Sequence, residues 1–235
     1  MKKLLVAGIA AAAFCGAPAL AADLPVKAPA YKAVAPMFNW TGFYVGAQAG
    51  YQWHHVGFGD PIPIIPNLGT YNANGFIGGV HAGYNYQVGN VVAGIEGDIE
   101  WADASGRGIG TGTDTVIGTG ELKWQGSARG RLGLVFDRTL LYVTAGAAWG
   151  RFNFGFGFPV IAPVFDNFST TLTGWTGGGG IEHAFAKNWR ARIEYRYTDY
   201  GTAKGSIVNC CAGPPNHQAH DVIAHAVRGG ISYAF

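Results

Sequence analysis

The sequence predicts an all-β protein: an eight-stranded antiparallel up-and-down transmembrane β-barrel. Three observations support this fold class. Only 13% of the residues are charged, which is little charge for a surface covered by water. Eight segments alternate apolar and polar residues, as strands with two different faces do. The tryptophans lie at the ends of these segments, and amphipathic indole rings collect where hydrocarbon meets water.

The N-terminal part of the chain has the features of an export signal. Lys2 and Lys3 precede an uncharged run, and a small-x-small cleavage site ends it, so residues 1–21 are predicted to be a signal peptide. Residues 22–39 are rich in proline and alanine and are predicted to be a linker, and residues 40–235 the barrel. Loss of Lys2 and Lys3 lowers the formal net charge from +2 to zero, which excludes nucleic acid as a partner.

Beyond the signal peptide no apolar run reaches the roughly 18 residues of a membrane helix, so a chain that crosses the membrane must do so as a barrel. Each alternating segment is long enough to cross about 25 Å of hydrocarbon on a tilt, at about 3.3 Å per residue. The predicted strands cover residues 42–53, 75–88, 91–102, 122–136, 140–152, 172–185, 189–199 and 221–235.

The connections between these strands alternate in length. Residues 89–90, 137–138 and 186–188 are predicted to be tight turns. Long loops rich in Gly, Pro, Asn and Thr cover residues 54–74, 103–121, 153–171 and 200–220. Short turns on one side and long loops on the other are typical of β-barrels in the outer membrane of Gram-negative bacteria. The even number of strands places both termini, and with them the linker, on the periplasmic side.

The aromatic residues are expected to form two belts around the barrel. The belt at the long-loop ends comprises Trp53, Trp101, Trp124, Trp149 and Trp175, with Phe76 and Tyr197 in the gaps. At the periplasmic ends we expect Trp189, with Trp40 nearby.

The face opposite the aliphatic residues carries acid and base groups near mid-strand. Counting from the short turns places Glu96 and Asp98 near the height of Arg129 and Arg131, and small neighbours leave room for buried bidentate pairs. A lipocalin-like soluble barrel would also alternate, but these paired charges favour a polar interior. The predicted interior network is Glu96, Asp98, Glu100, Arg129, Arg131, Glu182, Arg192, Glu194, Arg196 and Arg228.

Both ends of the predicted barrel carry recognisable sequences. Residues 38–46 read FNWTGFYVG and residues 228–235 read RGGISYAF. With the signal peptide and linker, they resemble the small porin-like outer-membrane proteins of alphaproteobacteria, the outer membrane immunogenic proteins, which are related to the OmpA-type barrel. The resemblance implies an abundant envelope protein, with pore activity or haem binding proposed for some members. Tyr233 and Phe235 resemble the C-terminal assembly signal of outer-membrane proteins.

Two sets of residues raise the question of a metal or a proton relay. Cys210 and Cys211, followed by His217 and His220, are of the types that bind soft metals. Adjacent cysteines chelate poorly, however, and the oxidising envelope favours a disulfide, so no metal and no cofactor are expected. His81 points inward, and a structural hydrogen bond is preferred there over a proton relay.

Catalysis is not expected. The outward His183 and His225 have apolar neighbours on the same face and no nucleophile beside them, so no triad is predicted and the protein is not expected to be an enzyme.

The predicted function is that of a structural, porin-like barrel that supports envelope integrity, because charged side chains can largely plug an eight-stranded lumen. The alternative is a surface protein that binds haem or a host ligand through its long extracellular loops, residues 54–74 above all. The expected partners are outer-membrane lipid and lipopolysaccharide, together with the assembly machinery through the C-terminal strand. The barrel is expected to be a monomer.

Overall fold

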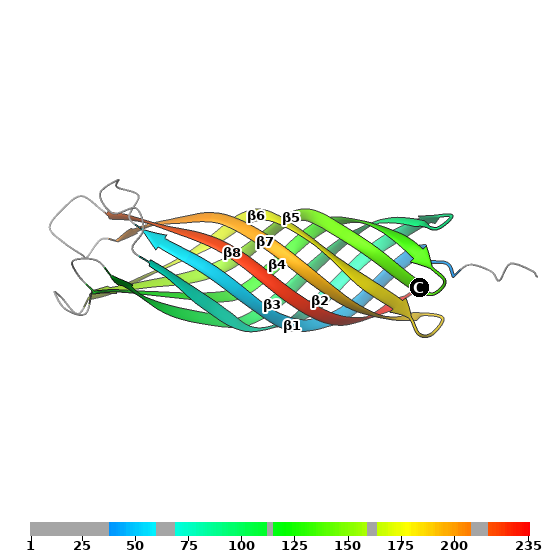
Figure 1. Cartoon of the computed structure of the whole chain (residues 1–235), viewed down its shortest axis with the longest axis horizontal. Helices are drawn as coiled ribbons and strands as arrows, with labels where there is room; N and C mark the ends of the chain where they lie inside the picture. Colours follow the sequence, from blue (N-terminus) through cyan, green and yellow to red (C-terminus); the bar gives the residue numbers. More distant parts are fainter. Residues whose placement is uncertain (1–37, 60–68, 112–114, 159–163, 208–215) are drawn as a thin grey trace, which may run out of the picture. The chain divides into compact units, whose positions relative to one another are not determined.

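The computed structural model describes residues 38–59, 69–111, 115–158, 164–207 and 216–235, which form a closed barrel of eight antiparallel strands (Figure 1). Each strand pairs with its neighbours in the sequence, and β1 pairs with β8. This confirms the predicted fold class. The strands are β1 (Gly42–Gly59), β2 (Gly69–Val88), β3 (Val91–Thr111), β4 (Thr115–Phe136), β5 (Thr139–Phe158), β6 (Val164–Ala184), β7 (Trp189–Ile207) and β8 (Asn216–Ala234).

Several predictions fall on parts of the chain outside this description. The signal peptide, almost all of the linker, Cys210 and Cys211 lie outside the described residues. In the part of the chain that is described, no helix is long and apolar enough to cross a membrane.

The strands are longer than the sequence predicted, and the predicted long loops are correspondingly wrong. β3 continues to Thr111 and β4 begins at Thr115, so most of residues 103–121 is strand. Strands of 18 to 22 residues that tilt by about 40° rise roughly 45 to 55 Å, about twice the height of the hydrocarbon layer. The barrel wall therefore extends far beyond the membrane on the loop side.

The turns at the other end agree closely with the prediction. Residues 89–90 and 137–138 are two-residue turns, and Gly89 (φ 61°) and Asp137 (φ 54°) adopt the left-handed conformation that such turns use. β6 ends at Ala184, so Phe185 belongs to the third turn. The C-terminus lies at this end of the barrel (Figure 1).

The outer face carries the predicted aromatic residues. Trp53, Trp101 and Trp175 are exposed, Trp124 and Trp149 are half-buried, and Trp189 is exposed near the short turns. Trp149 lies against Gly126 on the neighbouring strand, where an added Cβ would be 2.7 Å from the indole Nε1.

Trp40 does not join the belt at the short-turn end, contrary to the prediction. Its ring is 0% exposed and lies inside the barrel, where the Arg190 guanidinium stacks 4.5 Å from it. Trp40 precedes β1, so strand alternation does not set its direction, and the ring fills an apolar end of the lumen. The lower apolar cluster comprises Trp40, Val92, Val135, Leu140, Tyr142 and Ala184, with Phe38 against it.

With the short-turn end of the barrel taken as its lower end, the apolar alternation reverses its phase above the tryptophan belt. Below the belt the outer face is apolar and the lumen is polar except for the lower apolar cluster, whereas above the belt apolar side chains face the lumen and form an upper apolar cluster. Its members are Val56, Tyr71, Ala73, Ala104, Leu122, Ala148, Phe152, Phe154, Leu172, Tyr200, Ala203, Val222 and Ala224. The pairing register also shifts at this height, as between Leu122 and Trp124 on β4. Where water replaces lipid outside, burial in the lumen becomes the favourable place for apolar side chains.

Replacing Trp40 by alanine tests the position of this ring. We expect the free energy of unfolding to fall by about 3 to 5 kcal/mol, because truncating a buried aromatic side chain leaves a cavity. Urea titration of the refolded barrel in detergent micelles, followed by circular dichroism, measures the change. Trp189→Ala, which removes an exposed belt residue, is the control and should cost much less. Equal losses for the two variants would contradict the burial of Trp40.

Candidate functional site

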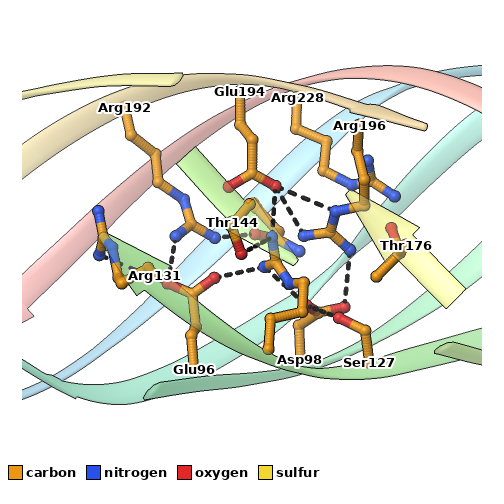
Figure 2. Close-up of polar contacts among 12 residues, drawn as sticks. Glu96, Asp98, Ser127, Arg131, Thr144, Thr176, Arg192, Glu194, Arg196 and Arg228 are labelled. Carbon is orange, nitrogen blue, oxygen red and sulfur yellow. Dashed lines mark hydrogen bonds and ion pairs between the residues drawn. The ribbon is translucent and has the colours of Figure 1, made fainter. Parts of the chain in front are cut away.

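All ten side chains of the predicted network are buried inside the barrel, between the two apolar clusters. Figure 2 labels seven of them: Glu96, Asp98, Arg131, Arg192, Glu194, Arg196 and Arg228. Because strand residues two apart share a face, β3 contributes Glu96, Asp98 and Glu100 to one wall. The basic and acidic groups of β4, β6, β7 and β8 face them: Arg129, Arg131, Glu182, Arg192, Glu194, Arg196 and Arg228. Arg190 on β7 is buried with them and belongs to the same face.

Glu96 is the centre of the lower half of this network. Its Oε1 lies 2.5 Å from Arg129 Nη2, and its Oε2 lies 2.5 Å from Arg192 Nη1. Arg131 Nη1 is 3.7 Å away, and the Tyr44 hydroxyl donates a hydrogen bond of 2.7 Å to Oε2. The carboxylate of Glu96 on β3 thereby contacts side chains from β1, β4 and β7. These contacts join opposite walls of the lumen.

Asp98 and Glu194 extend these contacts through shared arginines. Arg129 binds Asp98 at 3.0 Å and Glu194 at 3.0 Å, while Arg196 binds Asp98 at 3.1 Å and Glu194 at 2.8 Å. Ser127 donates a hydrogen bond of 2.6 Å to Asp98. Each carboxylate thus faces at least two guanidinium groups, as buried charges require.

One ion pair lies at each edge of the network. Arg228 binds Glu100 through Nε at 2.8 Å and Nη2 at 2.9 Å, a bidentate pair that crosses the lumen from β8 to β3. Arg131 binds Glu182 at 2.7 Å. Arg190 is the loosest member, because its Nη1 lies 4.0 Å from Glu182.

Glycines on the inner face provide space for the arginine side chains. An added Cβ at Gly94 would lie 3.2 Å from Arg131 Cγ, and one at Gly230 would lie 3.3 Å from Arg192 Cγ. Each of these glycines is the strand neighbour of the arginine that packs over it. The small residues on the inner face therefore provide the space in which the arginine side chains pack.

The histidines differ in part from the predictions. His81 is buried and its Nε2 lies 2.8 Å from Ser232 Oγ, so its hydrogen-bond partner is a hydroxyl and not a carboxylate. The sequence predicts no nucleophile beside the outward histidines, but each has a hydroxyl group next to it. Thr139 Oγ1 lies 3.0 Å from His183 Nδ1, and the Tyr195 hydroxyl lies 2.8 Å from His225 Nδ1. Strand pairing brings these partners together from positions about 30 to 44 residues apart.

These pairs do not complete a catalytic triad in the described residues, because no carboxylate there is hydrogen-bonded to either imidazole. The backbone of His217 and His220 lies in β8, but their side chains, like Cys210 and Cys211, are outside the description. Within the described residues, no group of three or more His, Cys, Asp or Glu side chains could hold a metal ion.

Known proteins resemble this chain in both sequence and fold. The family model for the outer membrane protein beta-barrel domain matches residues 7–235. The 31 kDa outer-membrane immunogenic protein of Brucella melitensis is 36% identical over 248 residues, which cover 100% of both chains. The 25 kDa outer-membrane immunogenic protein of Brucella abortus is 31% identical over 244 residues, covering 100% of this chain and 99% of the relative. The crystal structure of OprG from Pseudomonas aeruginosa covers 83% of this chain and 97% of its own, with a TM-score of 0.50 and 12% identity, a likeness of fold alone.

The central place of Glu96 can be tested by Glu96→Gln. This change leaves buried guanidinium groups without their counter-charge, so we expect the free energy of unfolding to fall by about 3 to 5 kcal/mol. Adding Arg192→Gln should restore part of the loss, because it removes one of the unpaired charges. Glu121→Gln, which breaks an exposed pair with Lys123, is the control and should cost less than about 1 kcal/mol. Urea titration of each refolded variant measures these values; losses that simply add in the double variant would count against the network.

Proposed function

Because this chain belongs to the outer membrane protein beta-barrel domain family, we propose that it is a structural outer-membrane barrel with a plugged lumen. It is a small β-barrel of the outer membrane of Gram-negative bacteria. One observation carries the proposal of a plug: the charged network joins opposite walls, and an apolar cluster lies on each side of it. An eight-stranded lumen is narrow enough for side chains to fill it.

The apolar clusters add a second barrier to ions. Phe152 and Phe154 are 3% and 1% exposed, and their rings stack 5.8 Å apart inside the upper part of the barrel. At the other end Trp40 is fully buried. An apolar constriction disfavours a continuous water column, and ions need one to cross. The plug therefore consists of three layers, a charged network between two apolar clusters.

The proposal includes an orientation in the membrane. The end with short turns faces the periplasm, since outer-membrane barrels keep their short turns there. Trp189, Tyr233 and Phe235 form an aromatic chain on the outer face at that end, with ring centroids 5.3 Å apart at each contact. We assign Tyr233 and Phe235 to the signal that the assembly machinery reads on β8. Outer-membrane lipid and lipopolysaccharide surround the barrel, which acts as a monomer.

The alternative function is capture of haem or a host ligand by the loops. Fewer residues are available for such a loop than the sequence suggested. The strands take up much of residues 54–74, and residues 60–68 lie outside the description. Titration of the folded barrel with haem, followed by its absorption spectrum, distinguishes the two functions: a saturable shift at micromolar haem would favour a binding protein.

Planar-bilayer recording tests the plug. We expect the wild-type barrel to show only small, intermittent conductance. Glu96→Ala combined with Trp40→Ala and Phe152→Ala should raise the unit conductance severalfold, because it opens the charged layer and both apolar clusters together. Ile95→Ala, Val143→Ala and Ile193→Ala, three changes on the exposed outer face, form the matched control. A large wild-type conductance that the lumen variants leave unchanged would rule out the plug.

A further inference from the structure

A polar hollow of about 740 Å³ lies on the outer face of β3, β4, β5 and β6, above the tryptophan belt. Its walls include Arg107, Thr119, Glu121, Asn153, Asn167 and Ser169. In the strand register Glu121 lies beside Asn153, and Asn153 beside Ser169, so their side chains form a polar row across three strands. These groups offer hydrogen-bond donors and acceptors close together, as a hydroxyl-rich ligand requires.

Gly155 forms part of the floor of this hollow. It lies between Thr119 on β4 and Asn167 on β6. An added Cβ would be 2.4 Å from Thr119 Oγ1 and 2.5 Å from Asn167 Oδ1. These two polar atoms therefore cover the glycine, one from each neighbouring strand. A side chain at position 155 would therefore displace the groups that line the hollow.

The height of the hollow indicates which part of the membrane it meets. Lower on the barrel, a hollow on the outer face is lined by Phe43, Val45, Ala82 and Ile95, as suits contact with acyl chains. Asn153 lies four residues beyond Trp149 of the belt, a rise of about 10 Å on a tilted strand. In the orientation proposed above, the polar hollow lies at the level of the headgroups of the outer leaflet.

Two arginines lie at the hollow on the same strands, while the carboxylate in its wall, Glu121, is already paired with Lys123. Arg107 is in its wall, and Arg151 lies between the hollow and the belt, beside Trp124 in the register. Among the described residues neither arginine makes an ion pair, whereas every arginine of the lumen network does. Exposed guanidinium groups at the headgroup level favour an anionic ligand, and phosphate matches their planar donors best.

We propose that the polar hollow, with Arg107 and Arg151, binds the phosphorylated sugar headgroup of a glycolipid of the outer leaflet. The sugar hydroxyls meet the polar row and the floor at Gly155, and the phosphates meet the two arginines. The acyl chains of the same molecule continue down the apolar outer face, so one ligand contacts both sides of the belt. This inference rests on the proposed orientation but not on the plugged lumen.

Titration of the folded, full-length mature barrel in detergent with short-core lipopolysaccharide tests the proposal. We expect Arg107→Gln with Arg151→Gln to weaken binding roughly tenfold or more, because each basic group at an anionic surface contributes several-fold to affinity. Gly155→Val should weaken binding as well, since it fills the floor. Arg138→Gln removes the same charge from the exposed turn at the opposite end of the barrel and should leave affinity unchanged.

Two further titrations show whether the barrel recognises the phosphates and whether it requires the lipid part of the ligand. Dephosphorylated lipopolysaccharide should bind as weakly to wild type as the intact form binds to the double arginine variant. The delipidated, still phosphorylated oligosaccharide should bind much more weakly than the intact glycolipid. Equal affinity of wild type and the arginine variant, or equal affinity for the soluble oligosaccharide and the glycolipid, would overturn the proposal. We expect bilayer conductance to be unchanged in the arginine variant, so failure of this proposal is distinguishable from failure of the plug.

Discussion

The structure depends first on the closure of β1 against β8. Hydrocarbon contains no water to satisfy backbone N–H and C=O groups, so a sheet that crosses a membrane must pair every strand and have no free edge. Closure with eight strands then determines the width of the lumen, which side chains can fill but which leaves little space for a water column. Alternation along each strand follows, with one side chain facing lipid and the next facing the lumen.

Within that narrow lumen, buried charge is stable only in groups. Glu96 meets three guanidinium groups, and Arg129 connects three carboxylates, so the charges at the centre of the network each have more than one partner. The contacts cross from β3 to β7 and β8 and connect strands that are not hydrogen-bonded to one another. Replacing one member leaves its partners unpaired, and this couples the walls of the barrel more tightly than adjacent strands alone would.

The surroundings change along the barrel axis, and the side chains change with them. Around the membrane the barrel has a polar interior and an apolar exterior; above the belt the two are exchanged. The tryptophans lie where this exchange occurs. In the proposed orientation, the same boundary brings a polar hollow to the headgroup level, with Arg107 and Arg151, which make no ion pair among the described residues. We propose this part of the outer wall, and not the filled lumen, as the recognition surface.

Alternation and turn residues in the sequence were sufficient to predict eight strands, the short turns, the outward tryptophans and which charged residues share the inner face, because these are local properties of a pleated strand. The ends of the strands were missed because the apolar phase reverses where water replaces lipid. Trp40 was misplaced because it precedes the first strand. Partner choice was also beyond the sequence: Arg228 lies beside Glu194 in the register but binds Glu100 across the lumen. Only closure of the barrel brings opposite walls within reach of a side chain, so the ion pairs across the lumen are decided by the tertiary structure, and the pairing among β3, β4, β5 and β6 decides the polar hollow.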